Sequence, residues 1–513
     1  MRNTNEPSAS IQRARRPIAV PATAVAASLA ALLAAAPVSA VVTAPAGFAV
    51  ETVANGFDRP IGMSFAPDGR LFVAEQRGMV WIVDPVLGKL PTPFINLQNE
   101  VGNAGDRGLL GIALDPSFAE NHLVYLLYTV DPMRGQPDEP GETATFSRLT
   151  RYAGTAESNG NVADEATRTV LIGAIPSEGI PACYSSHVIG SLRFGFDGSL
   201  FVSAGDSASF GWADVGGTTP GCFDPGLFGP EEDIGAYRSQ SLDSLAGKVL
   251  RVDPQTGAGL ESNPFYNGDP FAKRSRLWAT GLRNPFRMAI RPGSPAPGTL
   301  YIGDVGWNLV EEVNVAKGGE NFGWPCYEGN TAAPEYPALD VPFFGCDTIG
   351  TPVNPGPLTN PLVRWHHFND FISFPPGVIG RCAVSGVFYD GSSYPTKYQG
   401  RLFYSDHIFG WLRILTVTTT DTYVKSEVFG GGVNGVVDFA AHPQTRDVHL
   451  LLLGGDILRM RYVGADLNGD GVVNGADLGI LLAAWGLSNS PANLDGIGTV
   501  DGADLGILLA NWS

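Results

Sequence analysis

The sequence predicts an all-β fold, a six-bladed β-propeller, followed by a small α-helical calcium-binding module with paired EF-hand-like loops. Three observations lead to this prediction. A hairpin theme recurs six times, and 65 glycines and 39 prolines interrupt a chain of 513 residues that shows almost no helical periodicity. The third observation is a motif of loop and helix that occurs twice in the last 48 residues.

Each copy of the hairpin theme is an apolar strand, a turn rich in Pro, Asp or Gly, and a second strand that ends in small or acidic residues. The copies span residues 61–75, 110–116, 192–206, 286–304, 384–406 and 436–453. A sandwich would space its strands more evenly and an α/β fold would add amphipathic helices, so the repeat favours a propeller over residues 47–463. Two long segments, 206–245 and 326–382, interrupt the period and are expected to form functional rims.

The N-terminal segment has the features of an export signal. Arg13, Arg15 and Arg16 precede an Ala-rich apolar run, and a small-residue exit follows at residues 38–40. Residues 1–40 are therefore predicted to be a signal peptide, and the mature chain to be secreted, periplasmic or held at the cell surface. No later apolar run reaches eighteen residues, so no transmembrane segment is expected in the mature chain. A net charge of −18 argues against a nucleic-acid partner.

The C-terminal repeat opens with an oxygen-rich loop of twelve residues. Asp466, Asn468 and Asp470 offer side-chain oxygens at positions 1, 3 and 5, Val472 offers its carbonyl at position 7, and Asp477 closes the loop at position 12. This spacing is typical of an EF-hand calcium loop, because Ca²⁺ prefers oxygen ligands.

The second loop begins 27 positions later and has a weaker ligand set. Its predicted ligands, completed by water, are Asn493, Asp495, the Thr499 carbonyl, Asp501 and Asp504. Ile497 stands where position 5 needs an oxygen, so the first loop is expected to bind calcium more tightly.

Apolar residues at helical spacing follow both loops and predict two short helices, each with one buried face. They are Leu478, Leu481, Leu482 and Trp485 in the first copy, and Leu505, Leu508, Leu509 and Trp512 in the second. So small a module needs metal-filled loops to fold. The duplicated spacing resembles a type I dockerin over residues 464–513, and the resemblance implies attachment to a cohesin-type protein.

All five cysteines lie in the predicted exported body, where disulfides are the default. Two local pairings, Cys183 with Cys222 and Cys326 with Cys346, would each close a loop rich in Gly and Pro and leave Cys382 free. The sequence by itself leaves the connectivity open.

Motifs in the propeller body resemble one known family. They lie, in order, at residues 105–116, 185–187, 281–286, 303–314 and 318–325. They are similar to those of the soluble quinoprotein glucose/sorbosone dehydrogenases, whose relatives include the Hedgehog-interacting-protein-like propellers. The resemblance runs over residues 47–463 and implies oxidation of a sugar by pyrroloquinoline quinone (PQQ).

The resemblance also implies roles for individual residues. His187 would be the general base that takes the proton of a sugar C1 hydroxyl, because an imidazole accepts protons near neutral pH. Arg283 and Asn284 would lie against the quinone edge. Asp106 stands at the position where the family has a glutamine in the cofactor site. His407, at a strand end near the rim, is a further candidate for this site.

A calcium ion is implied beside the quinone. The carbonyls of Gly306 and Trp307 would hold this ion, and Glu311 or Glu312 would support it or a second calcium nearby.

The chain also departs from the family in the last blade. Family members that bind the quinone well have Arg-x-Arg-Asp there, whereas this chain has Gly, Val, Val and Asp at residues 435–438. The loss of two guanidinium groups predicts an acidic mouth that binds an anionic quinone poorly.

The function predicted from the sequence is therefore secreted, PQQ- and calcium-dependent oxidation of aldoses or oligosaccharides at C1, in an enzyme attached through a dockerin to a cohesin-bearing or surface complex. One alternative is a non-catalytic propeller that binds carbohydrate or protein, as in the Hedgehog-interacting relatives. Another is a calcium-dependent lactonase or esterase, since six-bladed propellers also carry those activities.

Overall fold

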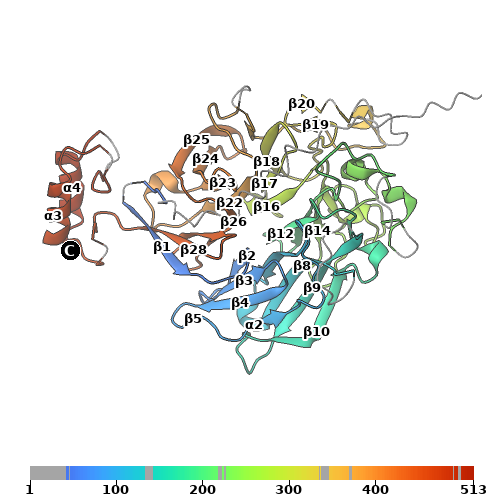
Figure 1. Ribbon diagram of the computed structural model, residues 1–513, viewed down its shortest axis with the longest axis horizontal. Coiled ribbons are helices and arrows are strands. Elements are labelled where there is room, and N and C mark those ends of the chain that lie inside the picture. The colour runs from blue at the N-terminus through green and yellow to red at the C-terminus, as the bar shows by residue number, and fades with distance from the viewer. Residues whose placement is uncertain are drawn as a thin grey trace, which may run out of the picture. The chain divides into compact units, whose positions relative to one another are not determined.

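Six antiparallel sheets surround a common centre in the computed structural model (Figure 1). The structure describes residues 42–45, 47–132, 143–217, 222–223, 227–333, 335–336, 346–368, 373–468, 470–488, 490–494 and 498–513. The predicted signal peptide at residues 1–40 lies outside the described residues. No described helix is long and apolar enough to cross a membrane.

The innermost strands of the six sheets form a closed ring. They are β2 (Pro60–Phe65), β7 (Leu109–Leu114), β12 (Ile189–Phe194), β16 (Pro285–Ile290), β22 (Ala383–Tyr389) and β26 (Val436–Ala441). Each packs against the next in this order, and β26 packs against β2. The fold is thus a six-bladed β-propeller, and each predicted hairpin copy begins one blade.

The outer strands complete each blade in sequence order. Blade 1 adds β3 (Leu71–Glu75), β4 (Met79–Asp84), β5 (Gly88–Lys89) and β6 (Ile95–Asn96), and blade 2 adds β8 (Leu123–Thr129), β9 (Thr145–Gly154), β10 (Ala163–Ile172) and β11 (Ile180–Ala182). Blade 3 adds β13 (Leu200–Ala204), β14 (Lys248–Val252) and β15 (Leu277–Ala279), and blade 4 adds β17 (Leu300–Asp304), β18 (Val310–Ala316) and β21 (Val363–His366). Blade 5 adds β23 (Arg401–Asp406), β24 (Leu412–Val417) and β25 (Tyr423–Gly430).

The last blade is closed by the N-terminal strand. It runs β26, β27 (Val448–Leu452), β28 (Ile457–Tyr462) and β1 (Phe48–Ala54), with β1 antiparallel to β28. Phe48 on β1 packs against four aromatic rings, including those of Tyr394 and Phe429 in blade 5. Because the first and last strands of the propeller pair within one sheet, this blade closes the ring.

Short helices and one hairpin occupy the connections between strands. They are α2 (Phe118–Asn121), η2 (Pro176–Glu178), η3 (Pro230–Glu232), η4 (Gly235–Gln240), η5 (Arg274–Arg276), η6 (Cys346–Thr348), η7 (Thr396–Tyr398), and the hairpin of β19 (Tyr327–Glu328) and β20 (Thr331–Ala332). The two excursions predicted from the sequence meet here, because Gln240 donates to Asn321 and accepts from Asn354 in a buried amide network.

Burial explains which residue types each strand contains. Strands β3, β13 and β17 lie second in their blades and are buried along their whole length, so their residues are apolar or small on both faces apart from the terminal Glu75 and Asp304. The outer strand β10 is largely exposed and carries polar residues. The tight turn between β2 and β3 places Gly69 at a φ of +96°, a conformation that glycine adopts without strain.

Both local disulfides predicted from the sequence are confirmed. Cys183 is bonded to Cys222 with a Cα–Cα distance of 5.3 Å, and Cys326 to Cys346 with 5.4 Å. Cys382 is the free thiol.

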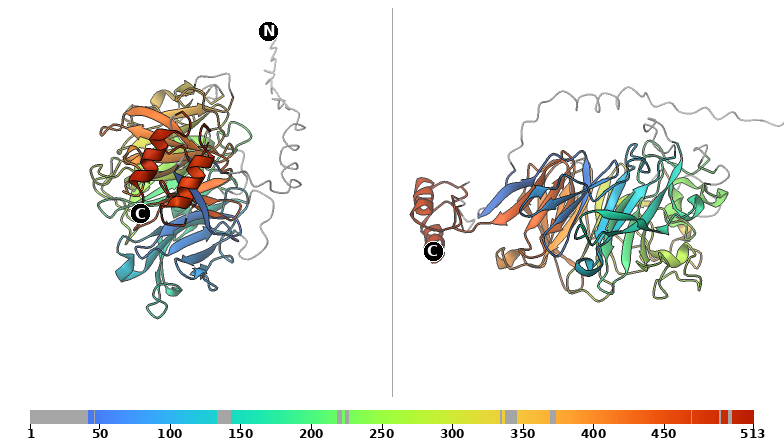
Figure 2. Two further views of the ribbon diagram at one scale, coloured as in Figure 1. Left: turned by 90° about the vertical axis from the view of Figure 1, so that its left-hand side faces the viewer. Right: turned by 90° about the horizontal axis from the view of Figure 1, so that it is seen from below.

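Residues 464–513 form two helices, α3 (Gly475–Ala483) and α4 (Gly502–Ala510), which lie side by side (Figure 2). Leu481 and Leu508 are fully buried between them. The prediction that the whole apolar stripe is buried is wrong, because Trp485 and Trp512 are 47% and 46% exposed. Two nine-residue helices cover only the faces they turn toward each other, so the far edge of each stripe stays in contact with solvent.

Candidate functional site

A cavity of about 400 Å³ lies at the end of the propeller where the chain enters the inner strands. All six blades contribute residues to this cavity. In each blade these residues lie just before or at the start of the inner strand, or just after the second strand. Its lining includes Arg59, Gln76, Asp106, His187, Arg283, Asn284, Gly306, Arg381, Cys382 and His407. Ring closure therefore collects loops from across the sequence into one site.

His187 is held in this cavity by a buried carboxylate. Its Nδ1 lies 3.0 Å from Oδ1 of Asp206, and the side chains of both residues are buried. Asp206 also accepts a hydrogen bond of 2.7 Å from the indole of Trp324. Burial alone would raise the pKa of Asp206, but His187, Arg283 and the backbone amide of Ala208 hold that pKa below its usual value.

The ionised Asp206 fixes the role of each imidazole nitrogen. A carboxylate can only accept a hydrogen bond, so Nδ1 carries the proton that it shares with Asp206. When the imidazole is neutral, Nε2 is then the ring nitrogen with the lone pair that a general base requires. The backbone of His187 has a φ of +52°, a strained conformation for a non-glycine residue that is common at functional sites.

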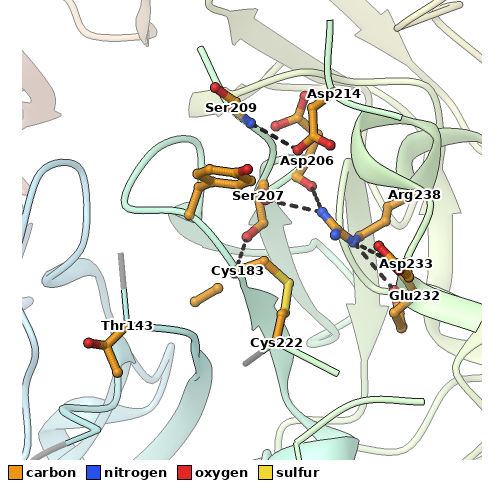
Figure 3. Close-up of a disulfide and its surroundings, with 12 residues drawn as sticks. Thr143, Cys183, Asp206, Ser207, Ser209, Asp214, Cys222, Glu232, Asp233 and Arg238 are labelled. Atoms are coloured by element: carbon orange, nitrogen blue, oxygen red, sulfur yellow. Dashed lines mark hydrogen bonds and ion pairs between the residues drawn. A yellow bond between two sulfur atoms is a disulfide. The ribbon is translucent and has the colours of Figure 1, made fainter. Parts of the chain in front are cut away.

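A disulfide and an arginine brace the loop that carries Asp206 (Figure 3). The amide of Cys183, which is bonded to Cys222, donates to the hydroxyl of Ser207 at 2.7 Å. The fully buried guanidinium of Arg238 donates to the carbonyls of Asp206 and Ser207 at 3.2 and 3.1 Å. The segment next to His187 is thus anchored at several points.

Arg283 lies on the same cavity and is stacked near an aromatic ring. Its guanidinium carbon is 5.5 Å from the ring centre of Trp324, and its Nη1 donates to the carbonyls of Val305 and Gly306. The amides of Arg283 and Asn284 both donate to Asp304. Burial raises the pKa of that carboxyl.

Asp106 and His407 also reach the cavity. Asp106 accepts a hydrogen bond of 3.3 Å from the amide of His187. Nδ1 of His407 lies 2.9 Å from the carbonyl of Val436, which leaves its Nε2 toward the cavity side of the ring. All four residues predicted to contact the cofactor therefore line one site with the predicted base.

The residues predicted to hold calcium are only partly brought together. The Gly306 carbonyl lines the cavity, yet it accepts a hydrogen bond of 2.7 Å from Arg283. Glu311 is hydrogen-bonded to His367 through one carboxylate oxygen and to the amide of Ala383 through the other.

The neighbouring residues are held in a similar way. Glu312 accepts from Asn314 and the Gly329 amide, while the amide of Trp307 is bonded to Glu328. Burial raises the pKa values of Glu311 and Glu312.

Three side chains at this site were not predicted from the sequence. Asp206 ends the second strand of the third hairpin, where antiparallel pairing brings it beside the residues that precede the first strand. Arg59 and Arg381 immediately precede inner-strand segments of blades 1 and 5. The prediction that the mouth of the cavity is acidic is wrong, because three arginines and one aspartate line the cavity.

Hydrogen bonds from backbone amides hold the side chains of the first C-terminal loop. Asp466, Asn468 and Asp470 each accept one such amide within the loop. Asp477 accepts the amides of Leu467, Asn468 and Asn474, and these bonds hold its pKa low although burial opposes them. Val472 lies in the same turn.

The second loop is described only in part, because Asp495 and Ile497 lie outside the described residues. Asn493 is 5% exposed, and its Oδ1 is buried with no hydrogen-bond partner among the described residues. Asp501 and Asp504 cap helix α4 through reciprocal side-chain bonds, and Thr499 precedes them in the loop. A buried oxygen without a hydrogen-bond partner at loop position 1 is available as a cation ligand.

Residues 57–436 match the family model of the glucose/sorbosone dehydrogenases. The chain belongs to the glucose/sorbosone dehydrogenase family. The matched segment contains His187, Asp206, Arg283 and His407, so the family likeness extends over most of the cavity.

Curated relatives in this family have related sequences. The HIPL2 protein of Arabidopsis thaliana is 28% identical over 412 residues, which cover 71% of this chain and 53% of that protein. The aldose sugar dehydrogenase YliI of Escherichia coli K12 is 27% identical over 291 residues, covering 56% of this chain and 64% of that enzyme. The chain thus spans less than two thirds of the length of either relative.

Solved structures share the propeller. The PQQ-bound form of an aldose sugar dehydrogenase from Streptomyces coelicolor aligns with a TM-score of 0.54 and 22% identity. That alignment covers 82% of this chain and 99% of the other. The likeness supports the fold of the glucose/sorbosone dehydrogenase family.

Proposed function

We propose that this glucose/sorbosone dehydrogenase homologue oxidises aldoses or oligosaccharides at C1 with PQQ as the electron acceptor. One observation carries the proposal: His187, oriented by the buried Asp206, faces the same cavity as Arg283. The family match and the relatives described as sugar dehydrogenases support the same chemistry.

The cavity fits PQQ in size and in charge. A space of about 400 Å³ suits a small polycyclic ligand, and PQQ carries three carboxylates. Arg59, Arg283 and Arg381 offer planar donors of the kind that recognise carboxylates. When bound, PQQ supplies the acceptor for the two electrons that leave the sugar as hydride.

His187 performs the proton transfer in this proposal. Its Nε2 takes the proton of the C1 hydroxyl while the C1–H bond breaks and its hydride leaves, so that the sugar becomes a lactone. The positive charge that develops on the imidazole is stabilised by Asp206, 3.0 Å from Nδ1. Arg283 would place a fixed cation beside bound PQQ and would stabilise its reduced form.

Calcium in the propeller stays a prediction. The carbonyls of Gly306 and Trp307 would hold the ion, but Arg283 now donates to the Gly306 carbonyl. Glu311 and Glu312 use their oxygens in internal hydrogen bonds. As arranged, these residues do not form a calcium site, because the two carboxylates are engaged in internal hydrogen bonds and the cationic Arg283 lies against the Gly306 carbonyl.

Export and docking are further parts of the proposal. The signal-like residues 1–40 support secretion to the periplasm or cell surface. The duplicated loops and helices support a calcium-binding dockerin that attaches the enzyme to a cohesin-type protein. Exposed apolar residues repeat in both copies, Leu482 and Leu509 on the helices and Trp485 and Trp512 just after them, and give such a partner a surface to bind.

The test is reconstitution of the purified protein with PQQ and calcium, followed by dye reduction with a panel of sugars. His187→Asn keeps an N–H donor at the position of Nδ1 for Asp206 but lacks a base, so the turnover rate should fall by roughly 100-fold or more. His442→Asn, at the opposite end of β26, is the matched control and should retain activity. A wild-type protein that binds PQQ yet oxidises no sugar would instead favour a binding propeller.

A further inference from the structure

We propose that Arg59 and Arg381, together with Arg283, hold the carboxylates of the quinone in place of the two arginines that are absent from the last blade. This inference rests on the proposed function, because it assigns residues to the same cofactor. It concerns two side chains that the sequence motifs did not single out.

The charge of the cavity is the first argument. Among its lining residues are three arginines and one carboxylate, Asp106, whereas the whole chain has a net charge of −18. Within the part of the chain that the structure describes, Arg59, Arg283 and Arg381 form no ion pair within 4.0 Å. Arginines that line a cavity without a carboxylate in direct contact are suited to an anionic ligand.

The second argument is that Arg59 is held at its base and free at its tip. Its Nε donates to Oε1 of Gln76 at 2.7 Å. The other end of that amide donates to the carbonyls of Gly105 and Arg107, at 2.9 and 2.7 Å, so the amide orientation is fixed. The terminal nitrogens of Arg59 are left to bind a ligand. Its φ of +48° shows that the backbone accepts strain to place it there.

Arg381 is positioned in a comparable way. Its backbone amide donates to the buried Asp406 at 2.7 Å, which anchors the residue beside the start of β22. Its guanidinium carbon lies 5.5 Å from the ring centre of Phe368. Stacking on an aromatic face orients a guanidinium while leaving its N–H donors available.

The third argument is the placement of the three cations around the ring. Arg59 precedes β2, and Arg283 precedes β16, three blades away and therefore opposite in a ring of six. Arg381 precedes β22, the blade after β16. Guanidinium groups on opposed sides match a flat ligand whose carboxylates point in more than one direction, as those of PQQ do. One side of the cavity alone could not neutralise such a ligand.

The experiment measures ligand binding rather than turnover. PQQ is titrated into full-length protein in calcium chloride, and binding is followed by quenching of tryptophan fluorescence. Arg59→Ala and Arg381→Ala should each weaken PQQ binding at least about tenfold, with partial recovery in the Lys variants, which keep the charge but lose the planar fork. Raising the salt concentration should weaken binding less in the variants than in the wild type.

Arg77→Ala is the matched control. Arg77 lies on the same turn as Gln76, is exposed and pairs with Asp58, so its loss removes one charge without changing the cavity. Wild-type affinity in both Arg59→Ala and Arg381→Ala would overturn the inference, as would equal weakening in the control.

Benzene-1,3,5-tricarboxylate serves as a second probe that separates the two proposals. If it binds in a manner that requires Arg59 and Arg381 while PQQ does not bind, the proposed function fails and the arginine site stands. If PQQ binds wild type and both variants equally, the assignment of the arginines fails and the proposed function stands. If wild-type protein binds neither ligand, both proposals fall.

Discussion

His187 shows how a single backbone conformation fixes a candidate base. Its φ of +52° and its bond to Asp206 direct the ring, and its carbonyl lies against Gly205. A Cβ added to Gly205 would lie 2.2 Å from that carbonyl oxygen, closer than any two such atoms approach. Glycine at this position is therefore required by space, and the fit of the loop depends on it.

Gly205→Ala should displace His187 and lower sugar oxidation at least about tenfold. The physical reason is that the added methyl would overlap the carbonyl of His187, and it would also lie 3.1 Å from the carbonyl of Arg283 on the other side of the loop. Gly211→Ala, in the same segment, meets no atom closer than 3.8 Å and should behave as wild type. Rates from dye reduction, with affinities from fluorescence titration, check both variants. Unchanged activity in Gly205→Ala would show that the loop can shift without harm.

At the scale of elements, the C-terminal helices depend on their loops. Helices α3 and α4 have nine residues each and begin with capping boxes at Asn474 and Asp501. Helices this short are marginal in water by themselves, and the core between them is small. The acidic oxygens gathered in the first loop repel one another unless a cation neutralises them, so calcium binding and folding should be coupled.

A fragment of residues 464–513 should be largely unfolded in a chelator and helical in calcium. Asp470→Ala should reduce that helicity more than Asp495→Ala, because Asp470 completes the stronger loop and is bonded to Asn468 and Val472. Circular dichroism during a calcium titration gives both the helicity and the affinity. A fragment that is equally helical in chelator would mean that apolar packing suffices and that the calcium prediction is wrong.

At the scale of the whole molecule, a buried carboxylate on the axis ties several blades together. Asp438 of β26 lies 3.2 Å from Arg193 of β12 and 3.4 Å from Arg287 of β16, and it accepts the amide of Met63 of β2. Arg287 is fully buried and also donates to the carbonyls of Ile61 and Val437. Four of the six inner strands thus meet in one polar network.

Asp438→Ala should lower the free energy of unfolding by about 3–5 kcal/mol, because it leaves buried arginine charge uncompensated. Asp456→Ala, an exposed aspartate in the same blade, should change stability by less than about 0.5 kcal/mol. Thermal and urea unfolding of the two variants measure the difference. Equal stability would imply that water or another carboxylate takes over the pairing with Arg287.

The sequence by itself determined the features that depend on local pattern. Apolar runs, turn residues and their repetition are properties of short segments, and they predicted all six blades through hairpins such as 192–206. Short spacing along the chain favoured the pairing of Cys183 with Cys222. Motifs placed His187 and Arg283 in one candidate site, and the cavity contains both.

Tertiary structure alone decided what closing the ring brings together. Arg59 and Arg381 are separated by more than three hundred residues, and no local signal marks them as neighbours of His187. The sign of charge in the cavity was predicted wrongly for this reason, since it is a sum over loops from different blades. The exposure of Trp485 and Trp512 also depends on tertiary structure. Periodicity marks a helix face as apolar, but only packing decides whether another surface covers that face.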